Sequence, residues 1–463
     1  MYLRKITLRN IKCFSNIEID FMSGDNPRLW TAILGQNGLG KSTLLQAIGV
    51  ALAGPWAVRE LLPVAEGWVR FDQPYGEIDA ILEWTEGDAQ TPKWPKKTPY
   101  IAKYIVTGKD PEDLDLTSSE RSLSLPPMSI VDWSGEGSSR ERERNAKDMS
   151  RLKQTAYAEN KKEGWLACGY GPFRRLSGGA QAADRILYSG RKSARFVTLF
   201  REDAALTDAT DWLVSLYNRS RDNDEVSKSI LSQITSVFAG EFLPEPCELI
   251  VNSHSASLKI RDRSPVSFQD LSDGYRSMLA LGIDLLRWIA AAFPESTNLL
   301  DSPGVILIDE LDAHAHPSWQ REVGFWLRKK FPKLQFIVAT HSPFLAQVSD
   351  EPGGYIVLEH SDNGVIQRDS VESIATWRAD QILTEIFDLP TTRSPEVEKK
   401  LDRLNQLLQR EHRLTPEERE EYKQLKMWSE TLPPGIEDLA EKRLASALQT
   451  AVDRLKDRIG AIE

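Results

Sequence analysis

A glycine-rich segment near the amino terminus has the composition of a phosphate-binding loop. Residues 35–42, here named the phosphate loop, read GQNGLGKS; they fit the Walker A pattern GxxxxGK[ST] and follow the apolar run 29–34. In such a loop, backbone N–H groups and the start of the next helix surround a polyphosphate. We expect Lys41 to bridge the β- and γ-phosphates of ATP, Ser42 to ligate Mg²⁺ and Thr43 to reach the α-phosphate. The other residues expected to contact the nucleotide are Gly35, Asn37, Gly38 and Gly40. The alternative is a glycine-rich turn that binds nothing.

Two adjacent acids follow a second apolar run. Residues 304–310 read GVILIDE, which is typical of a buried parallel strand that ends in carboxylates. We expect Asp309 to hold Mg²⁺ through its water shell and Glu310 to polarise the attacking water. The alternative is that the two acids cap the next helix. The strand FIVAT ends similarly in His341, within THSP at 340–343, and this histidine is expected to contact the γ-phosphate and the water.

A fourth segment opens a long apolar helix. Residues 270–277, here named the signature segment, read DLSDGYRS, and Ser272 precedes Asp309 by 37 positions. Ser272 and Gly274, at a helix N-terminus, could together form an anion site for a γ-phosphate. Residues 176–181, LSGGAQ, are closer in spelling to the ABC-type signature LSGGQ. However, they are not followed by a long apolar helix, so we interpret them as a loop.

These motifs together resemble the ABC-type ATPase heads of the RecF, SMC and OLD-nuclease group. The similarity is closer to the stand-alone ATPases of bacterial antiphage modules, namely Septu systems and retrons that carry a Septu-like pair. It covers about 1–98 and 165–390 and includes GYGPFRRLSGG, FQDLSDGYRSMLAL, ILIDELDAHAHPSWQ and FIVATHSPFLAQ. The resemblance implies an α/β head that uses ATP and Mg²⁺. It also implies a head-to-tail homodimer or higher homo-oligomer, in which Ser272 acts on ATP held by another copy. Asp273 replaces a glycine of the usual signature.

The remaining patterning predicts four regions. Residues 1–98 are expected to form an N-terminal lobe, with strands in 1–35 and a strand pair in 68–84, and 165–390 a C-terminal lobe. Residues 99–164 are interpreted as a partly flexible insertion, with a loop or exposed charged helix at 134–163. Apolar residues at helical spacing, near 397–408 and 444–459, predict a helical tail at 391–463 for oligomerisation or partner docking.

Composition excludes several other classes of protein. The chain has 463 residues, 41% of them hydrophobic, and a net charge of −10, which argues against a nucleic-acid binder that uses its whole surface. The longest apolar candidate, 278–293, is interrupted by Asp284 and Arg287, so no membrane association is expected. Three widely spaced cysteines predict neither disulfides nor a zinc-thiolate site. These features together indicate a cytoplasmic protein.

The resemblance also bears on partners. No DxD-type acid cluster follows His341, and the six histidines lack an HNH-like layout, so no nuclease site is expected in this sequence. The resemblance then implies that cleavage belongs to a separately encoded effector nuclease, of HNH type for example. His314 and His316 could suggest a metal site, but a turn that contacts the other subunit's nucleotide is preferred. The main functional hypothesis is an antiphage ATPase that controls this nuclease. Alternatives are a RecF- or SMC-like clamp on DNA or another nucleic acid, and a transporter ATPase, which the motif spacing fits poorly.

Overall fold

The computed structural model describes residues 1–85, 88, 99–108, 128–135, 137–158, 164–174, 181–187, 189, 191–204, 206, 209–240, 245–313, 315–349, 351, 353–368, 373–410 and 414–432. The chain divides into two compact units, Met1–Asp388 and Leu389–Glu463. In the part of the chain that the structure describes, no helix is long and apolar enough to cross a membrane.

A six-stranded sheet forms the centre of the first unit. Its order is β16-β15-β5-β14-β13-β9; the five strands from β15 to β9 are parallel and β16 is antiparallel. The predicted apolar runs 29–34, 304–309 and 336–340 are confirmed as strands of this sheet. Their residues are buried on both faces, as expected for a parallel sheet covered on both sides. The strands are β5 (Trp30–Leu34), β9 (Ala167–Tyr170), β13 (Gly304–Asp309), β14 (Leu334–Ala339), β15 (Tyr355–Ser361) and β16 (Gly364–Arg368).

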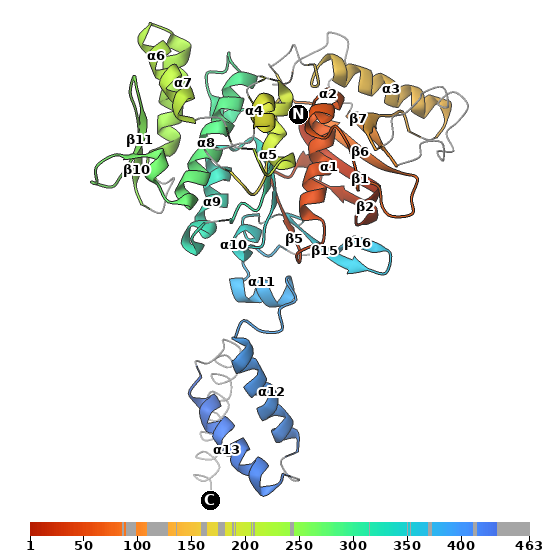
Figure 1. Cartoon of the computed structure of the whole chain (residues 1–463), viewed down its shortest axis with the longest axis vertical. Coiled ribbons are helices and arrows are strands. Elements are labelled where there is room, and N and C mark those ends of the chain that lie inside the picture. The colour runs from red at the N-terminus through yellow and green to blue at the C-terminus, as the bar shows by residue number, and fades with distance from the viewer. Residues whose placement is uncertain are drawn as a thin grey trace, which may run out of the picture. The chain divides into compact units, whose positions relative to one another are not determined.

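One face of this sheet packs on α1 and a five-stranded antiparallel sheet. The order of the second sheet is β2-β1-β6-β7-β8, and its strands lie beside α1 (Figure 1). Its apolar side chains share one core with α1 and with Val305 and Leu307 of β13. Two of its strands, β7 and β8, come from residues 99–164. The elements are β1 (Tyr2–Ile11), β2 (Phe14–Asp20), α1 (Lys41–Ala53), α2 (Pro55–Leu61), β6 (Tyr75–Glu83), β7 (Tyr100–Thr107) and β8 (Ile130–Asp132).

Of the two strands predicted in 68–84, only the second forms, so the prediction of a strand at 68–71 was wrong. Strand β6 forms, but Val69 makes only an isolated bridge to Ile11. The reason is that β6 occupies this edge of β1 as far as Arg9, which leaves only Asn10–Lys12 free beside segment 68–71. This edge is long enough for one bridge and its backbone hydrogen bonds, but too short for a strand.

A charged helix, α3 (Ser139–Gln154), covers the edge of the antiparallel sheet next to β7. Of the two alternatives expected for 134–163, a loop or a charged helix, the structure shows the helix. It begins with a capping box between Ser138 and Glu141, which satisfies two N–H groups of the first turn. It is only partly exposed, because Met149 and Leu152 belong to the core.

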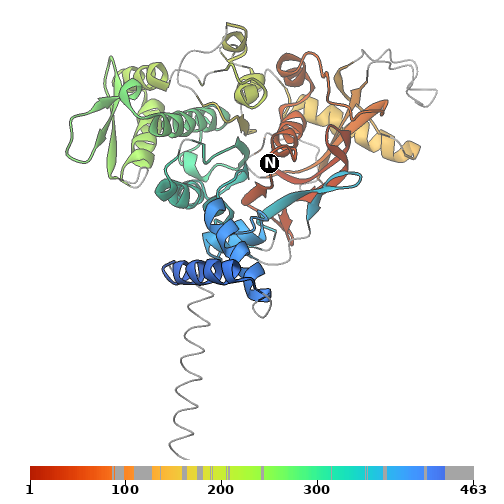
Figure 2. The ribbon, with the colours of Figure 1, turned by 60° about the horizontal axis from the view of Figure 1, so that its bottom comes forward.

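The opposite face of the central sheet packs on helices and a small antiparallel sheet. Ile306 and Ile308 of β13 point into this second core, which includes the long helix α8 (Asp273–Ala292). The long apolar helix predicted to begin at the signature segment is confirmed as α8. Residues 209–238 form helices of this half, and an antiparallel hairpin begins at Cys247. In both views, α3 and the pair α6–α7 lie at opposite ends of this unit (Figure 2). The other elements of this half are α6 (Ala209–Arg221), α7 (Glu225–Phe238), β10 (Cys247–Val251), β11 (Ala256–Ile260), β12 (Val266–Ser267) and α9 (Pro317–Lys330).

Several short elements connect these parts. They are β3 (Met22–Ser23), β4 (Asn26–Pro27), α4 (Gln181–Leu187), the 3₁₀ helix Lys192–Phe196, α5 (Val197–Phe200), the 3₁₀ helices Phe268–Asp270 and Leu299–Asp301, α10 (Pro343–Ala346) and α11 (Ala379–Glu385).

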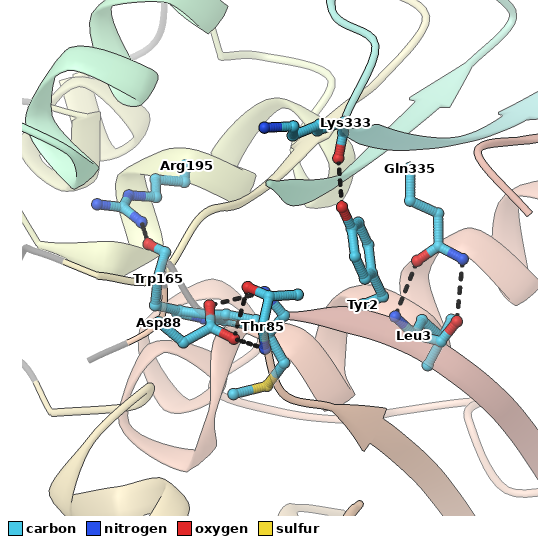
Figure 3. Close-up of polar contacts among 9 residues, drawn as sticks. Tyr2, Leu3, Thr85, Asp88, Trp165, Arg195, Lys333 and Gln335 are labelled. Carbon is cyan, nitrogen blue, oxygen red and sulfur yellow. Dashed lines mark hydrogen bonds and ion pairs between the residues drawn. The ribbon is translucent and has the colours of Figure 1, made fainter. Parts of the chain in front are cut away.

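The amino-terminal strand is fixed to the central sheet by a buried amide. The Gln335 side chain of β14 donates to the Leu3 carbonyl at 2.9 Å and accepts from the Leu3 N–H at 2.8 Å (Figure 3). The Tyr2 hydroxyl donates to the Lys333 carbonyl at 2.8 Å beside it. These bonds satisfy backbone groups where the β1–β6 register is interrupted between Leu3 and Lys5.

The second unit contains two described helices, α12 (Pro395–Gln409) and α13 (Pro416–Glu430). The helix predicted from the apolar spacing at 397–408 is thus confirmed as α12. Helix α13 begins with a capping box between Thr415 and Glu418. Arg403 of α12 forms a two-pronged ion pair with Glu421 of α13, at 3.0 and 2.8 Å. The helix predicted at 444–459 lies outside the described residues.

Candidate functional site

The phosphate loop follows β5 and leads directly into α1. Three of its glycines have positive φ, with 145° at Gly35, 83° at Gly38 and 82° at Gly40, which a side chain would strain. A Cβ atom on Gly40 would also lie 2.4 Å from the Cys13 sulfur of the neighbouring β-hairpin. The backbone therefore has the curled form that the sequence predicts, and α1 begins at Lys41.

Lys41 points back into the loop that precedes it. Its ammonium donates to the carbonyls of Gly35 at 2.9 Å and Gln36 at 3.0 Å. Burial lowers the pKa of Lys41, and attraction from Asp309, Glu310 and other acids opposes this effect. The two hydrogen bonds thus hold the ammonium group of Lys41 within the phosphate loop, where a phosphate would bind.

Asp309, at the carboxyl end of β13, faces the start of α1. Burial raises the pKa of its carboxyl group; a hydrogen bond with Ser42 is the largest opposing effect. Its Oδ1 atom is buried without a hydrogen-bond partner in the described residues. A buried, unpaired carboxylate oxygen is costly unless a ligand satisfies it.

The donor set fits Mg²⁺. A serine hydroxyl and a carboxylate are hard oxygen ligands, which this ion prefers, and the unpaired Oδ1 supplies an open position. Ser42 and Asp309, the two residues predicted as metal ligands, are therefore together in the structure.

Glu310 lies just beyond the end of β13. Its side chain is exposed, and its backbone has a φ of +48°, which is uncommon for a residue with a side chain. Such left-handed conformations occur where the surrounding structure fixes them, and they are frequent at functional sites.

His341 follows β14, next to β13 in the sheet. Burial lowers its pKa and the charge of Lys41 lowers it further, so the imidazole is neutral at pH 7. The preceding Thr340 is fully buried; its hydroxyl donates to Asp312 and accepts from the N–H of Ser342 at 2.9 Å. The turn after β13 and the segment that carries His341 are thus tied together.

The signature segment starts α8 with Ser272 as the N-cap residue. Ser272 is exposed, and its hydroxyl makes no capping hydrogen bond to the helix. Asp273, which replaces the usual glycine, forms a 2.8 Å ion pair with Arg276 in the first turn. The contact of Ser272 and Gly274 with a nucleotide of another copy stays a prediction.

The sequence also raised a possible metal site at His314 and His316 and a second signature-like segment, LSGGAQ. His316 caps α9, because its Nδ1 accepts from the N–H of Ser318 at 3.3 Å, while His314 lies outside the described residues. No cluster of potential metal ligands occurs among the residues that the structure describes. The LSGGAQ segment lies outside them as well, except for its last residue, where α4 begins.

Arg174 was not assigned a role from the sequence. It follows β9 in the GYGPFRR segment, and its side chain is 4% exposed. Its guanidinium donates to the carbonyls of Asp309 at 2.8 Å, Glu310 at 3.0 Å and Gly171 at 3.1 Å, and to the Ser277 hydroxyl at 3.2 Å. Burial lowers the pKa of Arg174 to about 10, so it keeps its charge at pH 7. The only signal for it was the resemblance, which places GYGPFRR, residues 169–175, where ABC-type ATPases have the segment between the two lobes that senses Mg²⁺ and the γ-phosphate.

Two family models match the chain. The model described as "AAA domain, putative AbiEii toxin, Type IV TA system" matches residues 100–347, more than half of the sequence. A second model, described as "AAA domain", matches residues 5–61, which include the phosphate loop.

Curated relatives match different portions of the chain. The Septu protein PtuA of Bacillus mycoides is 26% identical over 427 residues, covering 88% of this chain and 47% of the relative. The retron Ec83 probable ATPase of Escherichia coli is 34% identical over 164 residues, covering 35% of this chain and 27% of the relative. The chain therefore spans about half the length, or less, of these curated relatives.

Among solved structures, the SMC head bound to the C-terminal winged-helix domain of ScpA is 16% identical, with a TM-score of 0.47. The match covers 80% of this chain and 98% of that one.

Proposed function

Because the chain belongs to the AAA-domain family whose model matches residues 100–347, we propose that it binds Mg²⁺–ATP and hydrolyses it slowly. The observation that carries the proposal is the buried, unpaired Oδ1 of Asp309, next to the Ser42 hydroxyl and at the edge of the sheet where Lys41 lies. This arrangement is costly without a ligand, and a metal–polyphosphate would satisfy it.

The roles of the residues follow from their positions. Lys41 and the N–H groups of the phosphate loop bind the phosphates, and Ser42 and Asp309 hold the metal. Mg²⁺, when bound, neutralises phosphate charge. Glu310 accepts a proton from the attacking water, and neutral His341 orients this water or the γ-phosphate by hydrogen bonding.

The assay compares ATP turnover by the wild-type protein with two pairs of variants. We expect Lys41→Ala to lose nucleotide binding, whereas Lys333→Ala, at the opposite edge of the sheet, keeps it. Glu310→Gln should bind ATP but lower kcat at least 100-fold. Its matched control is Glu322→Gln on the exposed surface of α9. Wild-type turnover in Glu310→Gln, or ATP binding by Lys41→Ala, would contradict the assignment.

At the level of the assembly, we propose an antiphage complex in which two copies join head-to-tail around ATP, with Ser272 of one copy facing the nucleotide of the other. A separately encoded effector nuclease would be controlled by this ATP state. The similarity to Septu and retron proteins supports the defence role, and the exposed Ser272 supports the shared site. Glu310→Gln with ATP should elute as a dimer or larger oligomer; Glu310→Gln with Ser272→Arg should elute as a monomer.

The domain roles complete the proposal. Residues 1–98 and 165–390 supply the two lobes of the ATPase, 99–164 an insertion, and 391–463 a surface for oligomerisation or nuclease docking. Deletion of 391–463 should leave ATP binding intact but remove co-purification of the nuclease or shift the oligomer to a smaller size. Retention of both properties would show that the tail has neither role.

A further inference from the structure

We infer that Arg174 is a positioning residue that links the signature helix α8 to the catalytic carboxylate of Glu310. This inference rests on the proposed hydrolysis of ATP. It assigns no chemical step to Arg174; the guanidinium acts through the backbone that carries Glu310.

The first observation is where the guanidinium binds. The carbonyls of Asp309 and Glu310 flank the Cα atom of Glu310, and Arg174 donates to both, at 2.8 and 3.0 Å. Fixing both carbonyls restricts the two dihedral angles between them. Glu310 has a φ of +48°, a left-handed conformation that is unfavourable for a residue with a side chain. The guanidinium therefore holds the catalytic residue in its unusual conformation.

The second observation is what else the guanidinium binds. Its Nε donates to the hydroxyl of Ser277 at 3.2 Å, five residues along α8 from the exposed Ser272. Both Ser277 and Arg174 are buried. A movement of the first turns of α8 would thus displace the guanidinium of Arg174, which also fixes the backbone of Glu310. If a second copy's nucleotide engages Ser272, this contact conveys that event to the site of hydrolysis.

The third observation is that arginine is needed at this position. Four acceptors on three segments surround one planar group, which donates from Nε, Nη1 and Nη2. A lysine ammonium carries one charge at a single point and cannot reach both the Glu310 backbone and Ser277 with the same geometry. Arg174→Lys therefore keeps a buried cation but loses the bridge.

The main test is Arg174→Lys in the full chain, with Arg195→Lys as the matched control. Arg195 is equally buried, at 4% exposure, but donates to the carbonyl of Trp165 at 2.7 Å, ahead of β9 (Figure 3). We expect Arg174→Lys to lower kcat at least 10-fold while KM and the Kd for ATP change less than 3-fold. Arg195→Lys should keep kcat within 2-fold. Equal kcat in the two variants would overturn the inference.

Hydrogen exchange tests the positioning role of Arg174 even if the protein does not hydrolyse ATP. Hydrogen exchange in Arg174→Lys should be faster at residues 310–313, where the N–H of Ala313 bonds to the Glu310 carbonyl, and in the first turns of α8. Residues 247–260 should exchange as in the wild type. Wild-type exchange at 310–313 would refute the positioning role. Failure of the wild type to hydrolyse ATP would refute only the proposed function.

Ser277→Ala tests the link to α8 separately. It should lower kcat 2- to 5-fold alone and have no further effect when combined with Arg174→Lys, because both variants break the same bridge. Additive losses would mean that Ser277 and Arg174 act independently, and the link would be wrong.

Discussion

The buried Asp284 on the signature helix gives a quantitative prediction about stability. Its side chain is buried between α8 and β9, where Oδ2 accepts from the Tyr170 hydroxyl at 3.1 Å and Oδ1 lies 3.5 Å from Nη1 of Arg287. Burial raises the pKa of Asp284 from 3.8 to about 6, against the opposing charge of Arg287. Asp284→Asn removes the buried charge, and the amide oxygen can still accept from Tyr170. We therefore expect this variant to be more stable at neutral pH.

The size of the effect follows from the shift in pKa. One pKa unit corresponds to about 1.4 kcal/mol, so moving from 3.8 to about 6 is worth about 3 kcal/mol. A native pKa above the unfolded value means that the folded state binds the proton more tightly, so wild-type stability falls as pH rises from 4 through 6. The advantage of Asp284→Asn should be near zero at pH 4 and reach its full value, of order 1–3 kcal/mol, above pH 7.

Urea unfolding between pH 4 and 8 measures this difference. The matched control is Asp301→Asn, at an exposed position after the same helix, which should change stability by less than about 0.5 kcal/mol at every pH. A variant less stable than the wild type at pH 8 would contradict the reasoning, as would a difference that does not vary with pH.

Three further variants test other features. Gln335→Leu should lower stability by about 2–5 kcal/mol in urea unfolding, because it leaves two buried backbone groups of Leu3 unbonded; a loss below 0.5 kcal/mol would mean that water replaces the amide. Gly40→Ala should weaken ATP binding at least 10-fold by calorimetry, since its Cβ would overlap Cys13 at a positive φ; unchanged affinity would refute the importance of the loop conformation. Asp309→Asn should be more stable than the wild type without ligand but gain no stability from Mg²⁺–ATP, as measured by thermal shift; equal stabilisation of both proteins would show that Asp309 does not hold the metal.

Short sequence patterns were enough to predict the phosphate loop and the carboxyl end of β13 that faces it. Residues 304–308 are apolar on both faces, as a parallel strand covered on both sides requires, and Asp309 follows them at the end of the strand. Since parallel strands bring their carboxyl ends to one edge, the expectation that Asp309 and Ser42 meet followed directly, and the hydrogen bond between them agrees.

Features that depend on distant segments could not be predicted in this way. Segment 68–71 alternates like a strand, but whether it pairs depends on the free edges that β1 leaves. The role of Arg174 depends on carbonyls 135 and 136 positions away. Backbone carbonyls carry no residue-specific signal, so no motif could have named these acceptors.

The position of β5 in the central sheet has a consequence for synthesis. Its two neighbours, β14 and β15, begin about 300 residues later in the chain, at Leu334 and Tyr355. A nascent polypeptide therefore carries the glycine loop long before it carries the strands that support it. Nucleotide capture should begin only after residues up to about 361 have emerged from the ribosome, so ligand binding reports the completion of these strands during translation.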